Sequence, residues 1–542
     1  MRDFENINIT KEKIEKVLQR LKINKSPGPD GIHPRIVKEM KEELLEPLHM
    51  IFTSSLEEGI VPEDWKMAHI TAIYKKGNKK EPENYRPVSL TSVLCKVMET
   101  LLREELIYHM KENKLFSEKQ FGFISGRSTV LQLIKVLDSW TEAIDNKLAI
   151  DVVYHDFMKA FDRVPHKRLM EKVSSYNIKG RVFKWIQNFL TGRKQKVVVN
   201  GESSTWKNVL SGVPQGSVLG PLLFVLFIND LPEAVRNGSD VFLYADDTKI
   251  YRKIEDSEDL SKLQEDLDEL YHWTEKWLLS FHPEKSKCMR LGRTIVENKE
   301  YHLCNPIKTT DKEKDIGVVM DNKLAFSDHL SEKINKANRI VGLIRRSFVN
   351  LVPEVFKPLF TALVRPHLEY ANQVWNPHLV KDIEAVENVQ RRATKMIPQL
   401  KNKSYEERLR ALDLPTLAYR RSRGDQIEAF KIITGKYDRD CTEGLFQMRA
   451  ENVTRGNGMK IFKSRARLDI RKYSFNHRVV NNWNDLPNWV VAADTVQCFE
   501  SRLDRFWRNQ DQRYIYRAQI QTTTHSQQSD SAQTDVLEPQ AL

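Results

Sequence analysis

Apolar positions recur with the period of a helix near the start of the chain and with the period of a strand soon after it. Residues 10–22 place four apolar side chains on one helical face, with Thr10 in the position of an N-cap. Pro and Gly in KSPGPDG, residues 25–31, then end that helix. The same rules predict further helix over 36–60, a strand over 68–74, a basic, turn-rich loop over 75–87 and renewed helix over 92–114.

The pattern changes between about residues 148 and 251. Three short apolar runs, AIDVVYHDF, KQKVVVNG and VFLYADDTKIY, are separated by helical segments and by the Gly- and Pro-rich stretch SGVPQGSVLGP. This predicts an α+β core whose polar residues lie at strand ends. From about residue 323 helical periodicity dominates, and from about 518 the chain is polar and poor in aromatic residues, which predicts a disordered tail.

Size and composition narrow the class of protein. A chain of 542 residues with 40% apolar and 30% charged residues predicts a folded protein of two or more domains. The formal charge of +12 favours a polyanionic partner such as nucleic acid. Residues 331–480 hold 30 Lys and Arg against 16 Asp and Glu, so the basic character belongs to that one region.

Cysteine usage and hydropathy exclude several other classes. The five cysteines are scattered without a CxxC pair, so neither a disulfide framework nor a zinc site is indicated. The first ten residues, MRDFENINIT, form no apolar signal core, and the longest apolar run is far shorter than the roughly 20 residues of a membrane span. We therefore expect a soluble, intracellular protein with no membrane partner.

Three carboxylates lie where apolar strands are predicted to end. Asp246 and Asp247 stand at a turn between two β-prone runs, and Asp156 ends another run. The Asp-Asp pair alone is also compatible with a solvent-exposed turn. Three acids at two strand ends suggest a metal site, and oxygen-only ligation selects Mg²⁺ or Mn²⁺. Two such ions about 3.5–4 Å apart form the clamp used in phosphoryl transfer.

Several ordered motifs resemble the reverse transcriptases of LINE-type (non-LTR), Jockey-like retrotransposons. The resemblance covers nearly everything from about residue 8 to 507. It implies a right-hand polymerase in which an antiparallel palm sheet carries the catalytic Asp residues. The motifs are NKSPGPDGIHP (24–34), KKGNKKEPENYRPVSL (75–90), QFGFISGRST (120–129), DFMKAFDRVPH (156–166), SGVPQGSVLGPLLF (211–224), FLYADDT (242–248) and WLLSFHPEKSKCMRLG (277–292).

The resemblance also implies a division of labour along the chain. Its expected activity is RNA-directed DNA synthesis, in which deoxynucleotides are added to a DNA primer 3′-OH on an RNA template. The basic helices would hold the template–primer duplex, mainly through its phosphates. The implied domains are fingers and palm (1–300), a primer-grip and helical thumb-like region (301–440), a C-terminal region of unknown role (441–517) and the tail (518–542).

Carried over by motif, the resemblance assigns roles to individual residues at the metal site. Asp156 and Asp246 would ligate both metal ions, while Asp247 would support the site and contact metal less directly. Phe161 would lie under the sugar of the incoming nucleotide and exclude a 2′-OH. The composition of its surroundings alone would make Phe161 an ordinary core aromatic residue.

Further residues would handle the nucleotide. Lys75 and Arg86 would meet the triphosphate, where cationic donors offset developing charge. Gln215 and Gly216 would support the nascent base pair, with glycine allowing close backbone approach to nucleotide and template. Lys285 would protonate the departing pyrophosphate. Without the resemblance, the lysines and the arginine would be interpreted as solvated loop residues.

The sequence departs from the family at two histidines and at its start. The family usually has an aliphatic residue where His155 stands and Asn where His282 stands. A histidine that points into the palm core would need a hydrogen-bond partner. Elements of this family usually encode an endonuclease ahead of the polymerase, and this sequence begins almost at the first polymerase motif. Target nicking is therefore not assigned to it, and a separate endonuclease is an expected partner. Family members act in the nucleus or cytoplasm.

Two other hypotheses remain open from the sequence. The first is a catalytically silent retrotransposon remnant that still binds RNA or template–primer, which the two histidines support. The second is a viral-type RNA-dependent RNA polymerase, which Phe161 disfavours because such an enzyme must accept a 2′-OH. An intact set of three aspartates favours an active enzyme over the silent remnant.

Overall fold

The computed structural model describes residues 3–293, 299–348, 350–449 and 457–521. The chain divides into two compact units, which are described separately below. The first comprises residues 1–132 and 146–325, and the second comprises residues 133–145 and 326–542. The tail predicted from residue 518 falls outside the described residues from 522 onward.

The N-terminal helices of the first unit follow the predicted pattern with one break. The Thr10 hydroxyl accepts a hydrogen bond from the Lys13 N–H at 3.3 Å, which caps α1 as expected. The helix predicted over 36–60 is confirmed, with one interruption at Met40, where the backbone leaves the helical region and separates α2 from α3. The helices of this unit are α1 (Lys11–Gln19), α2 (Pro34–Glu39), α3 (Lys41–Glu58), α4 (Val93–Glu112), α6 (Ala160–Arg163), α7 (His166–Ser175), α8 (Gly180–Leu190), α9 (Gly220–Ile228) and α10 (Ser257–Trp277).

A first sheet is built on the predicted strand at 68–74. It has the order β2-β1-β4-β5, with β6 paired to β4. The basic loop predicted to reach residue 87 ends earlier, because its last residues pair with β1 as an antiparallel strand. Ala68 and Ile70 are buried, while the far half of β1 is exposed. The strands are β1 (Met67–Tyr74), β2 (Tyr85–Leu90), β4 (Lys194–Val199), β5 (Glu202–Ser203) and β6 (Lys207–Asn208).

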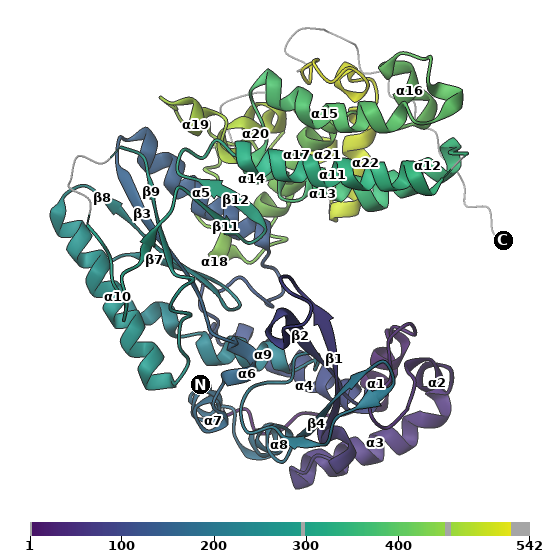
Figure 1. Cartoon of the computed structure of the whole chain (residues 1–542), viewed down its shortest axis with the longest axis vertical. Helices are drawn as coiled ribbons and strands as arrows, with labels where there is room; N and C mark the ends of the chain where they lie inside the picture. The colour runs from purple at the N-terminus through teal and green to yellow at the C-terminus, as the bar shows by residue number, and fades with distance from the viewer. Residues whose placement is uncertain (1–2, 294–298, 349, 450–456, 522–542) are drawn as a thin grey trace. The chain divides into compact units, whose positions relative to one another are not determined.

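A second, central sheet carries the predicted acidic strand ends. Its order is β10-β9-β3-β8-β7, and β3 is buried along its length except at its last residue. The helix α10 runs alongside this sheet and contacts β8 (Figure 1). The wholly apolar α9 is buried in the same hydrophobic core. The strands are β3 (Ala149–Asp156), β7 (Asp240–Tyr244), β8 (Asp247–Ile254), β9 (Lys287–Leu291) and β10 (Lys308–Thr309).

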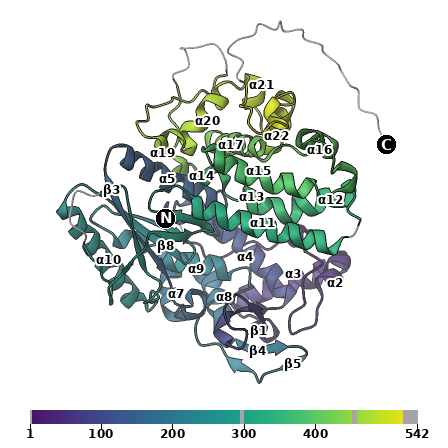
Figure 2. The same cartoon turned by 45° about the horizontal axis from the view of Figure 1, so that its top comes forward.

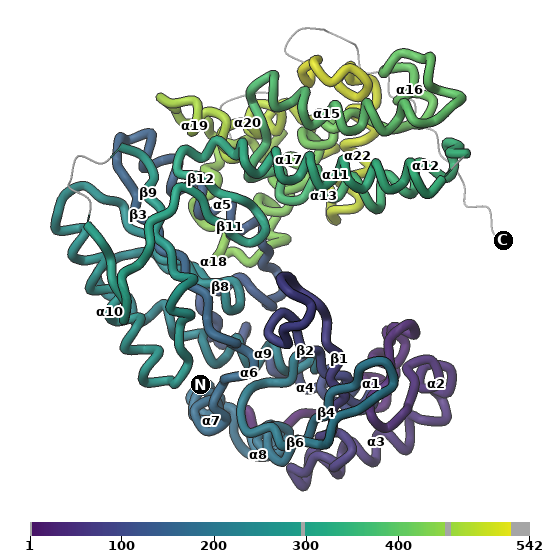
Figure 3. The backbone as a smooth tube through the Cα atoms, in the orientation of Figure 1, coloured from purple at the N-terminus to yellow at the C-terminus, as the bar shows by residue number. Residues whose placement is uncertain are grey.

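A short antiparallel hairpin completes the first unit. It consists of β11 (Lys312–Asp315) and β12 (Val318–Asp321). Ile316 and Gly317 form its turn with positive φ angles of 42° and 88°. The strand β11 contacts β9, so the hairpin lies beside the central sheet, as the backbone tube shows (Figure 3). This position brings the hairpin close to the end of the sheet that carries the acids.

The regular secondary structure in the described part of the second unit is helical, apart from one isolated bridge between Met448 and Ile461. This confirms the helical periodicity predicted from about residue 323. The helix α17 contacts α14, α15, α20 and α22 and forms the centre of the unit (Figure 2). Its helices are α11 (Ser327–Ser347), α12 (Pro353–Leu359), α13 (Arg365–Glu369), α14 (Asn372–Trp375), α15 (Val380–Thr394), α16 (Tyr405–Leu412), α17 (Leu417–Ile433), α18 (Arg439–Thr442), α19 (Asp469–Lys472), α20 (Phe475–Asn484), α21 (Asn488–Val491) and α22 (Val496–Phe506).

A segment from much earlier in the chain joins this second unit. Residues 133–145 are the larger part of α5 (Thr129–Asp145). The Asp145 carboxylate accepts hydrogen bonds from the backbone N–H groups of Arg467 and Leu468, and Arg471 pairs with Asp138. Within the described ranges, no helix combines the length and the apolarity needed to cross a bilayer.

Candidate active site

The hairpin of β7 and β8 carries two of the three predicted acids. Tyr244 pairs with Asp247, so Ala245 and Asp246 form the turn between the strands. Asp247 is therefore the first residue of β8 rather than part of the turn. Asp156, the last residue of β3, lies directly across from Asp247. Three carboxylates thus meet at one end of the central sheet.

Burial and like charge shift the pKa values of Asp246 and Asp247. Burial and the charge of Asp156 raise the pKa of Asp246, while Arg86 and Lys75 act in the opposite direction. Burial, Asp246, Asp156 and Asp315 together raise the pKa of Asp247 to about 6. Burial is thus the largest cause of both shifts, and repulsion between neighbouring carboxylates adds to it.

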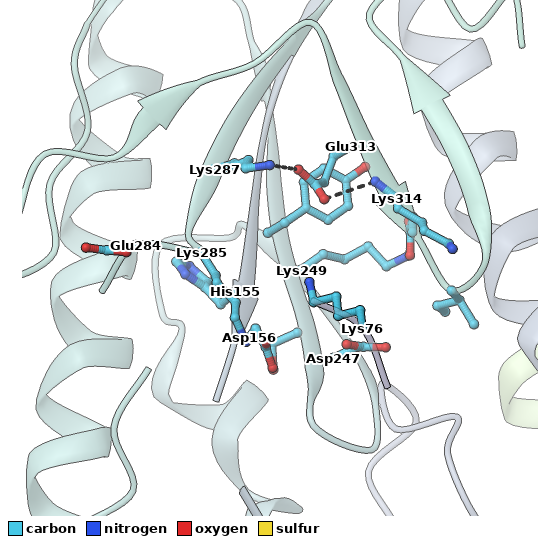
Figure 4. A pocket seen from close by; sticks show the side chains of 14 residues that line it. Lys76, His155, Asp156, Asp247, Lys249, Glu284, Lys285, Lys287, Glu313 and Lys314 are labelled. Carbon is cyan, nitrogen blue, oxygen red and sulfur yellow. Dashed lines mark hydrogen bonds and ion pairs between the residues drawn. The ribbon is translucent and has the colours of Figure 1, made fainter. Parts of the chain in front are cut away.

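Two of these acids, Asp156 and Asp247, line a cavity of about 400 Å³ in the first unit, and Asp246 is not part of its lining. Asp156 and Asp247 lie side by side in it, with Lys76 and Lys285 close to them (Figure 4). The Lys285 ammonium is 2.6 Å from Asp156 Oδ2. The cavity lining contains five acids and the same number of lysines, namely Lys76, Lys249, Lys285, Lys287 and Lys314.

The donor set matches a hard divalent cation, although the carboxylates do not yet converge on one. In the part of the chain that the structure describes, no three acidic, histidine or cysteine side chains are spaced as a closed metal site. One oxygen of Asp156 is instead paired with Lys285. All-carboxylate ligation suits Mg²⁺ or Mn²⁺, and a cation would relieve the repulsion that raises the Asp247 pKa. The Lys285 ammonium therefore competes with a metal ion for this Asp156 oxygen.

His155 and His282, the two histidines that differ from the family pattern, both make specific contacts. His155 is 4% exposed, stacks on Phe281 and shares a 3.0 Å hydrogen bond with the Ser286 hydroxyl. Burial lowers the pKa of His155 to about 3, so the ring is neutral. The predicted need for a partner is met at Nδ1, whereas Nε2 has none among the described residues. The His282 backbone N–H donates to the Asp156 carbonyl at 2.7 Å, a contact that any side chain at 282 can preserve.

Phe161 belongs to the short helix α6 that follows β3. Its ring stacks on Phe224 at 4.5 Å between centroids and meets Phe123 edge-on at 6.2 Å. The side chain is only partly buried and packs against the core. It thus combines the core role inferred from composition with an open side, and Phe224 fixes the plane of its ring.

Gly216 makes a close backbone approach to Ser89 of β2. Its φ is +126°, and a Cβ there would lie 2.3 Å from the Ser89 carbonyl oxygen. The adjacent Gln215 carbonyl accepts the Ser89 N–H at 2.7 Å. Glycine is therefore required to seat this loop against β2, and its approach to nucleotide and template stays a prediction. The Gln215 side chain reaches Asp162 at 3.4 Å.

Lys75 and Arg86 both come from the hairpin of β1 and β2. Lys75 directly follows β1, and its N–H donates to the Asn84 carbonyl at 2.8 Å. Arg86 lies opposite Ile73 on β2. Both side chains are exposed, and both favour the ionised form of Asp246. The hairpin thus directs two cations at the acidic strand ends.

Comparison with known proteins decides the family. Residues 73–323, which contain all three acids and this hairpin's cations, match the family model "Reverse transcriptase (RNA-dependent DNA polymerase)". The chain is 32% identical over 332 residues to the RNA-directed DNA polymerase from mobile element jockey of Drosophila melanogaster. The chain belongs to the reverse transcriptases of non-LTR retrotransposons.

Two further relatives of this reverse transcriptase come from the same fly. The chain is 30% identical over 402 residues to the probable RNA-directed DNA polymerase from transposon BS, and 28% identical over 396 residues to that from transposon X-element. These alignments cover 71% of the chain but 44% and 43% of the relatives. The jockey alignment covers 60% of the chain and 36% of the relative. The chain thus spans less than half the length of the curated relatives it matches.

Sequence reasoning missed two buried charged groups of this reverse transcriptase. Glu99 on α4 is fully buried and accepts the N–H groups of Val218 and Leu219 at 2.6 and 2.9 Å, which fixes the loop that carries Gln215. Lys249 on β8 forms an ion pair with Asp315 of β11, and both side chains are 4% exposed. A charged residue at an inward position of an apolar element is the sequence feature that could have identified Glu99 and Lys249.

Proposed function

We propose that this chain is an RNA-directed DNA polymerase that adds deoxynucleotides to a primer 3′-OH on an RNA template during retrotransposon replication. One observation supports it above all. Asp156, Asp246 and Asp247 meet at the ends of paired strands, inside the segment that matches the reverse transcriptase family. The cations of the neighbouring hairpin lie where a polyphosphate would need them.

The two sheets and the helices take the roles of a right-hand polymerase in this proposal. The central sheet is the palm, and the β1, β2 and β4 sheet with its N-terminal helices forms the fingers. The hairpin at 312–321 is the primer grip, and the helices up to about residue 440 form the thumb. No role is assigned to residues 441–517. The net charge of +14 over residues 331–480 suits binding to duplex phosphates.

The acids hold the metal ions in the proposed mechanism. Asp156 and Asp246 would ligate two Mg²⁺ or Mn²⁺ ions, and Asp247 would support them from the start of β8. Bound there, the ions would supply Lewis-acid stabilisation of the attacking and leaving oxygens. Lys285 would donate a proton to the departing pyrophosphate. Its ammonium already lies at the edge of the site.

The remaining residues bind and select the nucleotide. Lys75 and Arg86 bind the triphosphate as charge-assisted donors. Phe161, held by Phe224, lies against the sugar and leaves no room for a 2′-OH. Gln215 and Gly216 support the nascent base pair from a loop that Ser89 fixes through the backbone.

Primer extension on a poly(rA)/oligo(dT) duplex with Mg²⁺ or Mn²⁺ tests this function. We expect extension by the wild type and loss of extension in Asp246→Ala and Asp247→Ala, with duplex binding retained by both variants. Asp268→Ala, a change of an exposed acid on α10, should leave extension unchanged. A folded wild type that binds the duplex without extending it would favour the catalytically silent remnant instead.

A further inference from the structure

A segment of the QFGFISGRST motif runs along the edge of the central sheet beside the catalytic turn. The Leu243 N–H donates to the Lys119 carbonyl, and the Phe121 N–H donates to the Leu243 carbonyl, both at 2.8 Å. These two bonds form a parallel bridge between Gln120 and Leu243. The segment thus reaches β7 three residues before Asp246.

The Gln120 side chain extends this contact to the turn itself. It is fully buried, and its Oε1 accepts the Ala245 N–H at 3.0 Å and the Gly122 N–H at 2.7 Å. Two backbone donors identify this atom as the amide oxygen. Its Nε2 is buried and has no hydrogen-bond partner in the described ranges. Because the oxygen accepts two hydrogen bonds and the nitrogen makes none with the described residues, we infer that Gln120 acts through its amide oxygen.

The turn needs such a support because of its backbone. Ala245 has a φ of +54°, a left-handed conformation that residues with a Cβ disfavour. Gly122 also packs unusually close to this turn, since a Cβ on Gly122 would lie 2.4 Å from the Ala245 nitrogen. Gln120 therefore holds the Ala245 peptide by a hydrogen bond, and the missing side chain of Gly122 leaves the space that this peptide occupies.

The supporting segment is itself fixed. The Arg127 guanidinium donates to the Gln120 carbonyl at 2.6 Å and to the Ser117 carbonyl. Phe123, the residue after Gly122, has a left-handed backbone conformation, with a φ of +60°. Gln120 thus joins a braced loop to the residue before a predicted metal ligand.

We propose that Gln120 is a positioning residue, which holds the Ala245–Asp246 turn so that the Asp246 carboxylate can ligate the metal ions. The proposal rests on the proposed polymerase function and deepens it. Gln120 is buried and acts only through the Ala245 peptide. Its loss should therefore change the chemical step and metal binding while leaving the affinity for nucleotide and duplex nearly unchanged.

Gln120→Met keeps most of the side-chain volume and removes the acceptor. We expect kcat for single-nucleotide incorporation to fall by about 10²-fold, the cost of misplacing a reacting group by roughly 1 Å. KM for the dNTP and Kd for the duplex should stay within about threefold, because neither ligand touches Gln120. Gln390→Met is the matched control, since Gln390 is an equally buried amide of the second unit.

Gly122→Ala tests the same turn from the other side and should give the same kcat loss. Mn²⁺ binding, measured by electron paramagnetic resonance, should weaken by about tenfold in Gln120→Met, and this readout needs no catalysis. If the wild type is inactive but binds Mn²⁺ more tightly than Gln120→Met does, the proposed polymerase function is contradicted and the positioning role of Gln120 stands. If Gln120→Met has the kcat and the Mn²⁺ affinity of the wild type, or if Gln390→Met shows equal losses, the positioning role is overturned.

Discussion

The Lys285 ammonium lies 2.6 Å from Asp156 Oδ2, so a protein cation occupies one of the oxygens that a metal ion would need. The side chains are 48% and 34% exposed, respectively, which leaves both free to move. An exposed pair of this kind contributes little to stability and can exchange partners readily. The relationship links metal binding to release of the proposed proton donor.

Lys285→Met should therefore separate two effects. Incorporation should slow by about 10²-fold, because general acid catalysis is lost. Mg²⁺ should bind more tightly in the absence of nucleotide, because a competing cation is gone. Single-turnover kinetics and a metal titration measure the two quantities. Lys262→Met, which breaks an exposed ion pair with Glu258 on α10, should change neither. Unchanged incorporation in Lys285→Met would remove the proton-donor role.

Replacing Phe161 by Val should relax sugar selection. The smaller side chain opens space for a 2′-OH, and we expect the preference for dNTP over rNTP to fall by about 10- to 100-fold. The ratio of kcat/KM values for matched dNTP and rNTP measures this preference. Phe123→Leu, which alters only the edge-on neighbour, is the control. An unchanged ratio in Phe161→Val would mean that the ring is only a core residue.

His155 should make the protein sensitive to acid. The neutral ring has a pKa of about 3 in the folded chain against an ordinary value of 6.5, so the unfolded state binds the extra proton between these values. Stability contributed by the neutral ring is thus lost as pH falls below 6.5, by about 2 kcal/mol at pH 5. The difference between the thermal unfolding midpoints at pH 7 and pH 5 should be smaller in His155→Leu than in the wild type. An equal difference in the two proteins would contradict the burial of His155.

The Lys249–Asp315 pair should tie the 312–321 hairpin to the strand of Asp247. Both side chains are 4% exposed, so removing one leaves a buried, unpaired charge. Lys249→Met should destabilise the first unit by about 3–5 kcal/mol. Lys249→Met combined with Asp315→Leu should recover much of that loss, because no charge then stays buried. Urea unfolding of the three variants measures the coupling, and simple additivity would show that the groups act independently.

The spacing of apolar residues and the capping preferences predicted those elements whose formation depends on neighbouring residues in the sequence. The strand before Asp156, the hairpin around Asp246 and the Thr10 cap all follow from apolar alternation and capping preferences. The break at Met40 was missed because neither Gly nor Pro marks it. The strand β2 was missed because its Pro and charged residues resemble a loop until pairing with β1 is known.

Contacts between distant residues could not be inferred from one sequence. His155 meets Ser286, 131 residues later, and Lys249 meets Asp315, 66 residues later. The true neighbour of Gly216 is Ser89, which no spacing rule links to the loop. The three acids were identified because strand ends gather at one edge of a sheet. Their partners depend on how the whole first unit packs.

Single-nucleotide incorporation on a defined RNA template is the decisive test of RNA-directed DNA synthesis by this chain. Each of the four dNTPs would be offered to the purified chain with a DNA primer and Mg²⁺, beside Asp246→Asn, which removes one ligand charge at similar volume. We expect that only the dNTP complementary to the next RNA base is added, and that Asp246→Asn adds none while still binding the duplex. Incorporation by Asp246→Asn at the wild-type rate, or no incorporation by a wild type that binds duplex and Mn²⁺, would contradict the proposed polymerase function.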